Sequence, residues 1–265
     1  QTYDKCFDYL LNRPGVDYFA WSDGEVAVLE IIEKFISKNF SLEKLKKNDE
    51  PINGCASISV DKKKLLVGKY IARIGLEGSV KSSGRDIIQS PYTTGLLDKF
   101  LDGNSIPAFE TARGCPFLCT FCDQGLDASK ITAFSSKRLL EEFWYVGEKM
   151  SKLENGTKTV AVFDSNWGLF EKDVELAEYV LEVMNKYDWP QYIECLTPKS
   201  NRENILRIND ILKNRVQIGL SMQSMNMETL SDIKRKNWTT QEYLDFVDES
   251  RKRRKAATSE IIIPL

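Results

Sequence analysis

The sequence contains no histidine, and this absence narrows the chemistry open to the chain. Without an imidazole, a Ser-His-Asp triad and His-ligated zinc or haem are excluded within it. An excess of one charge is lacking too, because 37 Lys and Arg side chains stand against 39 Asp and Glu side chains. The net charge of −2 gives no global basic field that would hold nucleic acid nonspecifically.

Long apolar runs are missing as well. No run reaches the roughly 18 residues that a membrane helix needs, and the first ten residues, QTYDKCFDYL, lack the charged-then-apolar order of a signal peptide. We therefore expect no membrane span and a cytoplasmic location. Position 1 is Gln and the last residues, EIIIPL, read as a strand cut in mid-course, so we expect a fragment of a longer protein.

The apolar pattern divides the 265 residues into three parts. Residues 1–60 are expected to be the end of an α/β unit, with a strand at 16–21 and an amphipathic helix at 25–40. Residues 61–105 are expected to be a connector, because they hold charge runs and a Gly/Ser-rich loop, although a hairpin is expected at 56–69. From residue 106 a regular alternation of strands and helices begins.

The alternation in residues 106–265 predicts a parallel sheet. The expected strands are 106–111, 158–163, 191–196, 215–220 and 259–264, and the expected helices are 136–152, 171–186, 201–213, 227–236 and 240–254. This βαβ rhythm is typical of α/β proteins. It does not separate a doubly wound sheet from a full or partial (β/α) barrel. In either fold the active site lies at the carboxyl ends of the strands.

Three of the six cysteines are clustered directly after the first of these strands. Cys115, Cys119 and Cys122 have the spacing C-x3-C-x2-C, which indicates a reducing compartment and a metal site. Three thiolates can hold three irons of a [4Fe–4S] cluster and leave the fourth iron open, whereas electron-transfer clusters usually have four thiolates. The alternative is a zinc site with Cys195 as fourth ligand. Zinc knots usually pair two Cys-x2–4-Cys halves or add His, and the chain has neither.

The segment RGCPFLCTFC at 113–122 resembles the signature of radical S-adenosylmethionine (SAM) enzymes, in which an aromatic residue, here Phe121, precedes the last Cys. The resemblance covers roughly residues 90–265 and, more weakly, 1–89. It implies that Cys115, Cys119 and Cys122 hold a [4Fe–4S] cluster whose unique iron is chelated by SAM. It also implies reductive cleavage of SAM to a 5′-deoxyadenosyl radical, an electron donor such as flavodoxin or ferredoxin, and a partial (β/α) barrel.

The same resemblance assigns SAM-binding roles to residues at other strand ends. Asp164 and Asn166 match the position that meets the methionine amino group, and Glu194 matches a carboxylate near SAM. A turn and helix cap, or an ion pair of a buried carboxylate, are the alternatives for these residues. Cys195 is expected to point away from Glu194 and to be a buried thiol, because side chains alternate along a strand.

Further along the chain, Gln223, Ser224 and Arg235 resemble the family segment that contacts the ribose and the carboxylate of SAM. Phe121 is expected to pack near the adenine. Helix capping by Ser224 and a solvated Arg235 are the alternatives. No residue is assigned a catalytic role of its own.

Two upstream matches resemble a branch of the family in which a cobalamin-binding domain precedes the radical barrel. They are the turn Asp23-Gly24-Glu25 and the segment Ser90-Pro91-Tyr92. The resemblance implies that residues 1–60 are the C-terminal part of such a Rossmann-like domain and that the full-length protein binds cobalamin. A helical N-terminal extension is the alternative. The His that often ligates cobalt in that branch is absent.

Three functions are therefore weighed. The first is a radical SAM enzyme for cobalamin-linked methylation or rearrangement of an unidentified small molecule, lipid or saccharide. The second is a methylthiotransferase, which carries three further Cys in an N-terminal domain, whereas only Cys6 and Cys55 lie upstream here. The third is a non-catalytic binding module stabilised by zinc or a cluster. No aromatic-basic stripe indicates a nucleic-acid partner.

Overall fold

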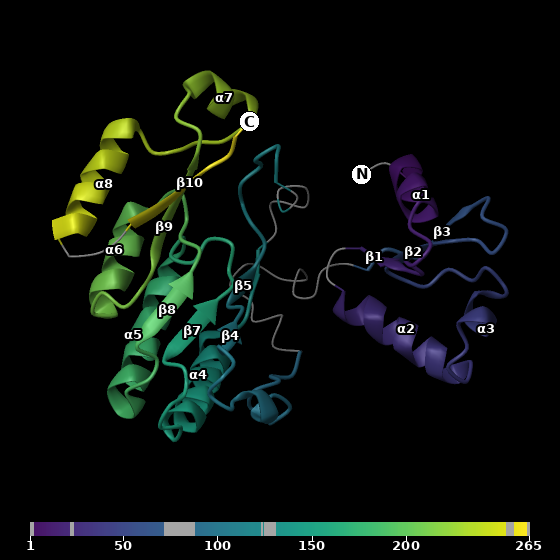
Figure 1. Cartoon of the computed structure of the whole chain (residues 1–265), viewed down its shortest axis with the longest axis horizontal. Helices are drawn as coiled ribbons and strands as arrows, with labels where there is room; N and C mark the ends of the chain where they lie inside the picture. Colours follow the sequence, from purple (N-terminus) through teal and green to yellow (C-terminus); the bar gives the residue numbers. More distant parts are fainter. Residues whose placement is uncertain are drawn as a thin grey trace. The chain divides into compact units, whose positions relative to one another are not determined.

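The computed structural model describes residues 3–21, 24–71, 88–122, 124, 131–252 and 257–263. The chain divides into two compact units, Gln1–Leu76 and Glu77–Leu265 (Figure 1). Asp23 of the expected turn and most of the Gly/Ser-rich loop lie outside the described residues. Among the helices of the described ranges, none is long and apolar enough to cross a membrane.

The first unit contains an antiparallel sheet of three short strands. Its elements are α1 (Tyr3–Leu11), β1 (Phe19–Ala20), α2 (Glu25–Ser37), α3 (Leu42–Lys46), β2 (Cys55–Ile58) and β3 (Leu65–Val67). β2 lies between β1 and β3, with Ala56 opposite both Phe19 and Val67. These elements confirm the early strand, the helix from residue 25 and the hairpin. A Rossmann-like domain is built on parallel strands, so the assignment of residues 1–60 to one stays a prediction.

The apolar stripe of α2 faces solvent to a large extent. Only Ala27 of this helix is buried, in a small cluster with Leu45, Ile52 and Cys55. Leu29 and other large apolar side chains of α2 are exposed in this unit. The amphipathic pattern therefore predicted the helix correctly, while little of its apolar face is packed within the unit.

The second unit carries parallel strands that alternate with helices. Its elements are η2 (Asp98–Phe100), β4 (Ala108–Phe109), β5 (Ala112–Arg113), β6 (Thr132–Ala133), α4 (Ser136–Ser151), β7 (Thr159–Val162), α5 (Glu171–Tyr187), β8 (Tyr192–Cys195), α6 (Arg202–Ile211), β9 (Ile218–Gln223), α7 (Met227–Asp232), α8 (Thr240–Lys252) and β10 (Ala257–Ile261). The five expected strands correspond to β4, β7, β8, β9 and β10, each shifted by a few residues at its ends.

The parallel strands follow one another across the unit. β4 pairs with β7, β7 with β8, and β9 with β10, all in parallel. A parallel bridge between Ile193 and Val216 joins the two groups, with backbone bonds of 2.8 Å from Ile193 N to Arg215 O and 2.9 Å from Gln217 N to Ile193 O. The unit is thus mixed α/β, and the described residues form no closed barrel.

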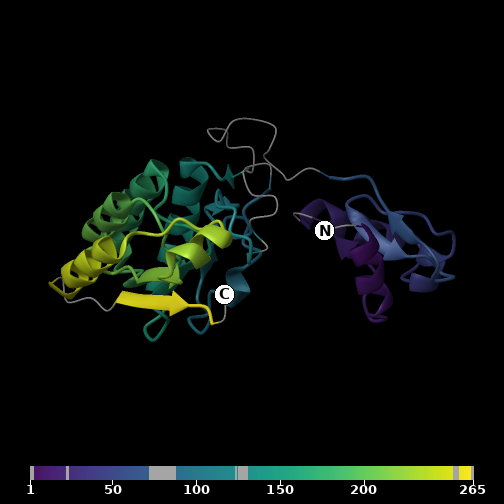
Figure 2. The same cartoon turned by 90° about the horizontal axis from the view of Figure 1, so that it is seen from above.

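Helices α4, α5 and α6 pack in sequence beside the strands, as Figure 2 shows. The core between them is apolar and includes Phe143, Val160, Val180 and Trp189, all fully buried or nearly so. Phe109 of β4 stacks on Phe143 of α4, with ring centroids 4.0 Å apart. This packing fixes the strands whose carboxyl ends carry the candidate site.

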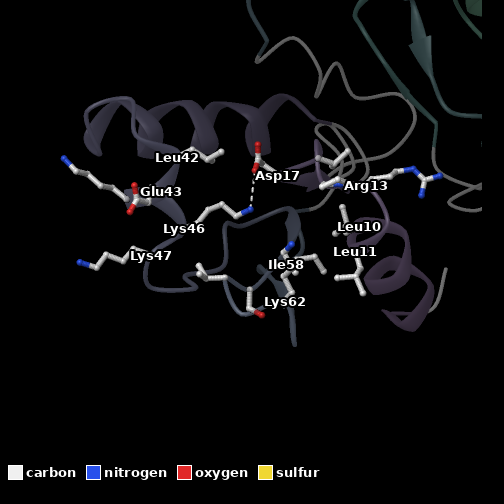
Figure 3. Close-up of a pocket in the computed structure, with 15 residues that line it drawn as sticks. Leu10, Leu11, Arg13, Asp17, Leu42, Glu43, Lys46, Lys47, Ile58 and Lys62 are labelled. Atoms are coloured by element: carbon white, nitrogen blue, oxygen red, sulfur yellow. Dashed lines mark hydrogen bonds and ion pairs between the residues drawn. The ribbon is translucent and has the colours of Figure 1, made fainter.

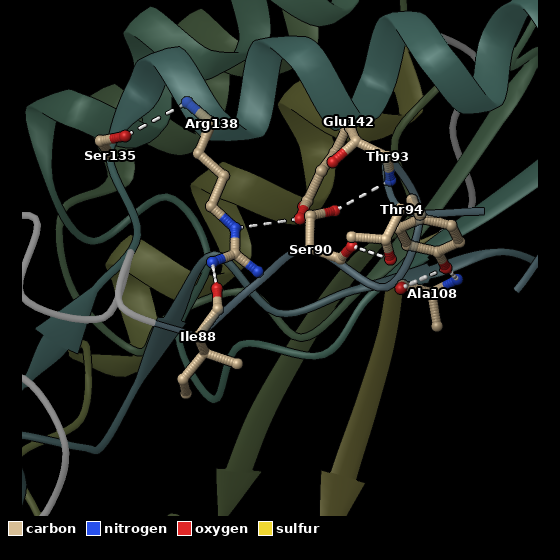
Figure 4. A network of polar contacts seen from close by, with 9 residues as sticks. Ile88, Ser90, Thr93, Thr94, Ala108, Ser135, Arg138 and Glu142 are labelled. Carbon is tan, nitrogen blue, oxygen red and sulfur yellow. Dashed lines mark hydrogen bonds and ion pairs between the residues drawn. The ribbon is translucent and has the colours of Figure 1, made fainter. Parts of the chain in front are cut away.

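The segment before β4 is fastened to the same core (Figure 4). The Tyr92 hydroxyl donates to Ala108 O at 2.7 Å and accepts from Ala108 N at 3.0 Å, so it acts as a partner for the strand. Arg138 of α4 donates to Glu142 at 3.0 Å and to the carbonyl oxygen of Ile88. The segment around Ser90-Pro91-Tyr92 therefore has a structural role in positioning β4.

Helices α4 and α5 approach closely at Gly147. A Cβ atom added there would lie 2.6 Å from Cγ1 of Val183 and 3.2 Å from Cδ2 of Tyr187. The distance to Val183 is well inside van der Waals contact, and its side chain is fully buried, so it has little room to move.

We expect Gly147→Ala to lower the free energy of unfolding by about 1–2 kcal/mol, because overpacking outweighs the roughly 1 kcal/mol that Ala gains in helix propensity. Urea titration followed by circular dichroism measures the change. The control is Gly15→Ala, where an added Cβ meets nothing within 4 Å. A Gly147→Ala chain as stable as the wild type would contradict the close approach.

Candidate functional site

The three-cysteine loop is closed at its base by two short strands. β5 and β6 pair antiparallel, with Ala112 opposite Ala133. The loop between them, residues 114–131, contains Cys115, Cys119 and Cys122. It begins at Gly114 with φ of 110°, a conformation that residues with a Cβ rarely adopt. The loop thus starts and ends at fixed positions beside the carboxyl end of β4.

Asp164, just past β7, holds the residue that leads into this loop. Its Oδ1 accepts from Thr111 N at 2.6 Å, and its Oδ2 accepts from the Thr111 hydroxyl. The side chain is 4% exposed, and burial raises the pKa of Asp164 to about 6 against the opposing effect of hydrogen bonds from Thr111 and Ala112. A buried carboxylate is costly unless it is hydrogen-bonded, so Asp164 and Thr111 stabilise each other's positions.

The rest of the β7–α5 loop also contacts the cysteine loop. Asn166 Nδ2 lies 3.3 Å from the sulfur of Cys115, and the Ser165 hydroxyl donates to Gln124 Oε1. The β7–α5 loop is itself held by Asp173 in the first turn of α5, whose Oδ2 accepts from Gly168 N and from Phe170 N, both at 3.0 Å. Desolvation by burial raises the pKa of Asp173.

Two cationic side chains face Cys119. Lys199 Nζ lies 2.9 Å from its sulfur and 4.1 Å from the centroid of the Phe117 ring. Arg235 Nη1 lies 3.9 Å from the same sulfur, and Arg235 also donates to Asn237 Oδ1 at 2.7 Å and to Ser221 O. Both cations are therefore placed to form charge-assisted contacts with this sulfur.

The donor set fits an iron–sulfur cluster better than other metals. Three thiols on one loop, in a chain without His, are soft ligands of the kind that hold iron–sulfur clusters. Cys119 is buried, while Cys115 and Cys122 are half-buried. In the ranges that the structure describes, no three Cys, Asp or Glu side chains lie close enough together to bind a metal ion. The ligand assignment of the three cysteines therefore stays a prediction.

Gln223 ends β9 with an unusual combination of features. Its side chain is 8% exposed, and its buried Oε1 has no hydrogen-bond partner among the described residues. Its φ of 62° is rare for a residue other than glycine. Buried polar atoms are nearly always paired, and strained backbone clusters at functional sites. Next to it, the Ser224 hydroxyl accepts from Asn226 N at 3.2 Å.

The face of the sheet that carries Glu194 is open. Glu194 is exposed on β8 and makes no hydrogen bond or ion pair with the described residues, so the alternative of a buried, ion-paired carboxylate is wrong, and its place near SAM stays a prediction. Phe163 and Leu196 follow β7 and β8 in register on this side, and they are 70% and 58% exposed. Cys195 is buried on the opposite side, as expected, with its sulfur 3.7 Å from Gln217 O, and desolvation raises its pKa.

Two curated proteins are similar in sequence to this chain over more than half of its length, although no family model matches the chain. The 2-(S-pantetheinyl)-carbapenam-3-carboxylate methyltransferase of Streptantibioticus cattleyicolor is 29% identical over 168 residues, 58% of this chain and 23% of that protein. The cobalamin-dependent radical SAM methyltransferase TokK of Streptomyces tokunonensis is 26% identical over 254 residues, 88% of this chain and 32% of that protein.

The fold is shared with a solved structure. The cobalamin-dependent SAM radical enzyme OxsB, with aqua-cobalamin and SAM bound, matches with a TM-score of 0.62 and 16% identity over 97% of this chain and 34% of that one. OxsB with aqua-cobalamin alone also gives 0.62, with 15% identity over 99% of this chain and 36% of that one. The chain is a relative of the cobalamin-dependent radical SAM enzymes. It spans about a third or less of the length of the relatives it matches.

In this relative of the cobalamin-dependent radical SAM enzymes, the structure brings several predicted residues together. Asn166 contacts Cys115, and Arg235 contacts Cys119. Asn237 links Arg235 with the backbone of Ser224, because it accepts from Arg235 and donates to Ser224 O at 3.1 Å. Phe121 is partly exposed, and nothing among the described contacts places it near the other predicted residues.

Sequence reasoning missed Thr111, Lys199 and Asp173. Thr111 follows β4, and Lys199 lies in the segment after β8. Both therefore sit past the carboxyl ends of parallel strands, and this rule is the signal that could have found them. Asp173 lies in the first turn of α5, where a carboxylate stabilises free backbone N–H groups.

Asp164 makes a pH-dependent contribution to stability. Because its pKa in the folded chain, about 6, lies above that of an ordinary carboxyl, the folded state holds the proton more tightly than the unfolded state does. Its contribution is therefore most favourable below pH 4 and falls as the pH rises to about 6. Two pKa units correspond to at most about 3 kcal/mol.

We expect the wild type to lose about 1–3 kcal/mol relative to Asp164→Asn between pH 4 and pH 6.5. Denaturant titrations of both chains at a series of pH values measure the difference. A stability difference that does not change over this range would refute the buried, protonating carboxyl. Thr111→Val tests the same contact from the other side, because it removes the hydroxyl that donates to Asp164.

Proposed function

We propose that the chain is the cluster- and SAM-binding part of a radical SAM enzyme that methylates or rearranges an unidentified substrate in a cobalamin-linked reaction. The observation that carries this proposal is the set of contacts on the cysteine loop. Asn166 reaches Cys115, and Lys199 and Arg235 reach Cys119, all from the carboxyl side of parallel strands. When bound, the cluster would supply one electron for the cleavage of SAM to methionine and a 5′-deoxyadenosyl radical.

Each residue around the loop has a distinct task in this proposal. Cys115, Cys119 and Cys122 hold the cluster. Lys199 and Arg235 offset the negative charge of the thiolates, and hydrogen bonds to cluster sulfurs tune its electronic properties. Asp164 keeps the start of the loop in place through Thr111.

The SAM contacts are proposed on the β7–α5 loop and around the ends of β8 and β9. The unpaired Oε1 of Gln223 needs a hydrogen-bond donor, which a ribose hydroxyl supplies. Arg235 suits the SAM carboxylate, and Asn166, Asp164, Ser224 and Glu194 complete the proposed polar set. Phe121 is proposed to pack near the adenine.

The substrate is proposed to meet the open face beside the ends of β7 and β8. Phe163 and Leu196 give this face an exposed apolar surface, which favours a small molecule, lipid or saccharide with an apolar part. Methylation is favoured because both curated relatives are named methyltransferases. We further propose that the parallel strands form an open, partial (β/α) barrel, because they follow one another in the order β4, β7, β8, β9 and β10.

Cobalamin, a small electron-transfer protein such as flavodoxin or ferredoxin, and a cytoplasmic location belong to the same proposal. The relative TokK is named cobalamin-dependent. Free thiols at six positions suit a reducing compartment. No residue of this chain is assigned to cobalamin.

Two alternatives are disfavoured by particular contacts. A methylthiotransferase needs a second set of cluster ligands upstream, whereas Cys6 and Cys55 are buried in two different apolar clusters, and burial raises the pKa of both thiols. A zinc module needs Cys195 as fourth ligand, but that thiol is buried in the apolar core of the second unit, with its sulfur 3.7 Å from Gln217 O.

Anaerobic iron–sulfur reconstitution tests the cluster directly. We expect the wild type to take up about four irons per chain and to form 5′-deoxyadenosine from SAM with a strong reductant. Replacing Cys119 by Ser should abolish both, because a ligand is lost. Cys195→Ala, which removes a buried thiol outside the loop, should retain both. A chain that binds zinc, stays colourless with iron and makes no 5′-deoxyadenosine would overturn the proposal in favour of a binding module.

Lys199 provides a second test. We expect Lys199→Met to lower the rate of 5′-deoxyadenosine formation by about tenfold or more, as is typical when a partner of a metal ligand is removed, and to shift the cluster potential to more negative values. Lys199→Arg should restore much of the loss. Lys137→Met, at an exposed site on α4, is the matched control. Equal rates and potentials in Lys199→Met and the control would show that Lys199 has no role at the thiolate.

A further inference from the structure

The first unit contains a cavity of about 790 Å³ whose lining residues are all separate from the candidate site (Figure 3). Its walls come from the end of α1 and the segment after it, from α3, and from the end of β2 with the turn beyond it. The volume falls within the range of about 300–1,000 Å³ that small-molecule sites occupy. Because one unit supplies every wall, the cavity does not depend on the position of the second unit.

The lining of the cavity is largely aliphatic. Its apolar members are Leu10, Leu11, Pro14, Val16, Leu42, Ile58 and Val60. Leu11, Val16, Leu42 and Val60 are exposed although they surround one hollow. Single exposed apolar residues need no explanation, but a group around a concavity marks a binding site. The lining contains no aromatic side chain, which argues against stacking on a nucleobase.

The rim of the cavity is basic. It carries Arg13, Lys44, Lys46, Lys47 and Lys62 against two acids, Asp17 and Glu43. Lys46 Nζ lies 3.3 Å from Asp17 Oδ1, as Figure 3 shows, so this lysine neutralises one of the acids. Within the described residues Lys44, Lys47 and Lys62 form no ion pair. The chain as a whole has a net charge of −2. The excess of positive charge at this rim is therefore a local feature and does not follow from the composition of the chain.

We propose that the cavity binds an amphiphilic anion, a molecule with an aliphatic part and a phosphate or carboxylate head. The aliphatic part removes the exposed Leu11, Val16, Leu42 and Val60 surfaces from water. The head group lies among the unpaired lysines of the rim, where charge-assisted hydrogen bonds form. Neither part alone accounts for both the apolar lining and the basic rim. This site is independent of the radical chemistry proposed for the second unit.

Isothermal titration calorimetry of the full 265-residue chain tests the proposal with three probes. They are dodecyl phosphate below its critical micelle concentration, dodecyl maltoside as a neutral amphiphile, and inorganic phosphate. We expect saturable binding of one dodecyl phosphate per chain, at least about tenfold weaker binding of the maltoside, and weaker binding at high salt because exposed charges are screened. Inorganic phosphate should not bind measurably.

Charge reversal at the rim separates this site from nonspecific attraction. Lys44→Glu with Lys47→Glu should weaken dodecyl phosphate binding by about tenfold or more, because like charges then face the head group. Lys5→Glu with Lys69→Glu makes the same charge change at exposed positions outside the lining and should leave affinity within about twofold. Leu42→Asp, at the start of α3, removes apolar lining and should weaken both amphiphiles. Circular dichroism of each variant verifies folding.

Several results would overturn the proposal. They are no binding of dodecyl phosphate, equal affinity for the neutral amphiphile, and equal losses in the rim and control variants. Vesicles containing phosphatidic acid distinguish a membrane from a free amphiphile as the source of the head group. Binding to vesicles without binding to monomeric dodecyl phosphate would replace the cavity site with a membrane-binding surface.

Discussion

The candidate site depends on one buried carboxylate. Asp164 lies just past the end of β7. Both of its carboxylate oxygens accept hydrogen bonds from Thr111, which immediately precedes β5. Burying a carboxyl group is costly, and the hydrogen bonds from Thr111 offset that cost only while the two strand ends stay together. Val160 and Val162 of β7 are buried in the core of the second unit. This packing fixes Asp164, and Asp164 in turn fixes the start of the cysteine loop.

Polar and apolar side chains occupy different parts of the candidate site. Hydrogen-bond donors contact the sulfurs: the amide of Asn166 contacts Cys115, and the cationic groups of Lys199 and Arg235 contact Cys119. Apolar surface lies open on the neighbouring strand ends, at Phe163 and Leu196. The proposed cluster and the proposed apolar substrate would therefore have different surroundings a few residues apart along the same strands. This division suits chemistry in which the cofactor reacts and the protein orients and excludes water.

The sequence was informative where spacing or periodicity carries the signal. The spacing C-x3-C-x2-C predicts the cysteine site, which stays a prediction, and the run of β-branched residues near 158–163 correctly predicted β7. The pair of β5 and β6 was missed, because two-residue strands have no periodicity to detect. Lys199 was missed because its partner Cys119 is 80 residues away, in a relation only the fold creates. A buried ion pair was the alternative for Glu194 because parallel strands are usually covered on both faces, whereas one face of β8 is open in the described residues.

The contacts of the site also join residues that are far apart along the chain. Thr111 and Asp164 are separated by 53 residues, Cys119 and Lys199 by 80, and Cys119 and Arg235 by 116. Contacts of such sequence separation form slowly, because loop closure must come before they stabilise the chain. The strands from β4 to β9 therefore have to assemble before the thiols gain their partners. During synthesis the cysteine loop emerges long before Lys199 and Arg235, so Cys119 reaches its buried position, which limits the access of oxidants, only late in folding.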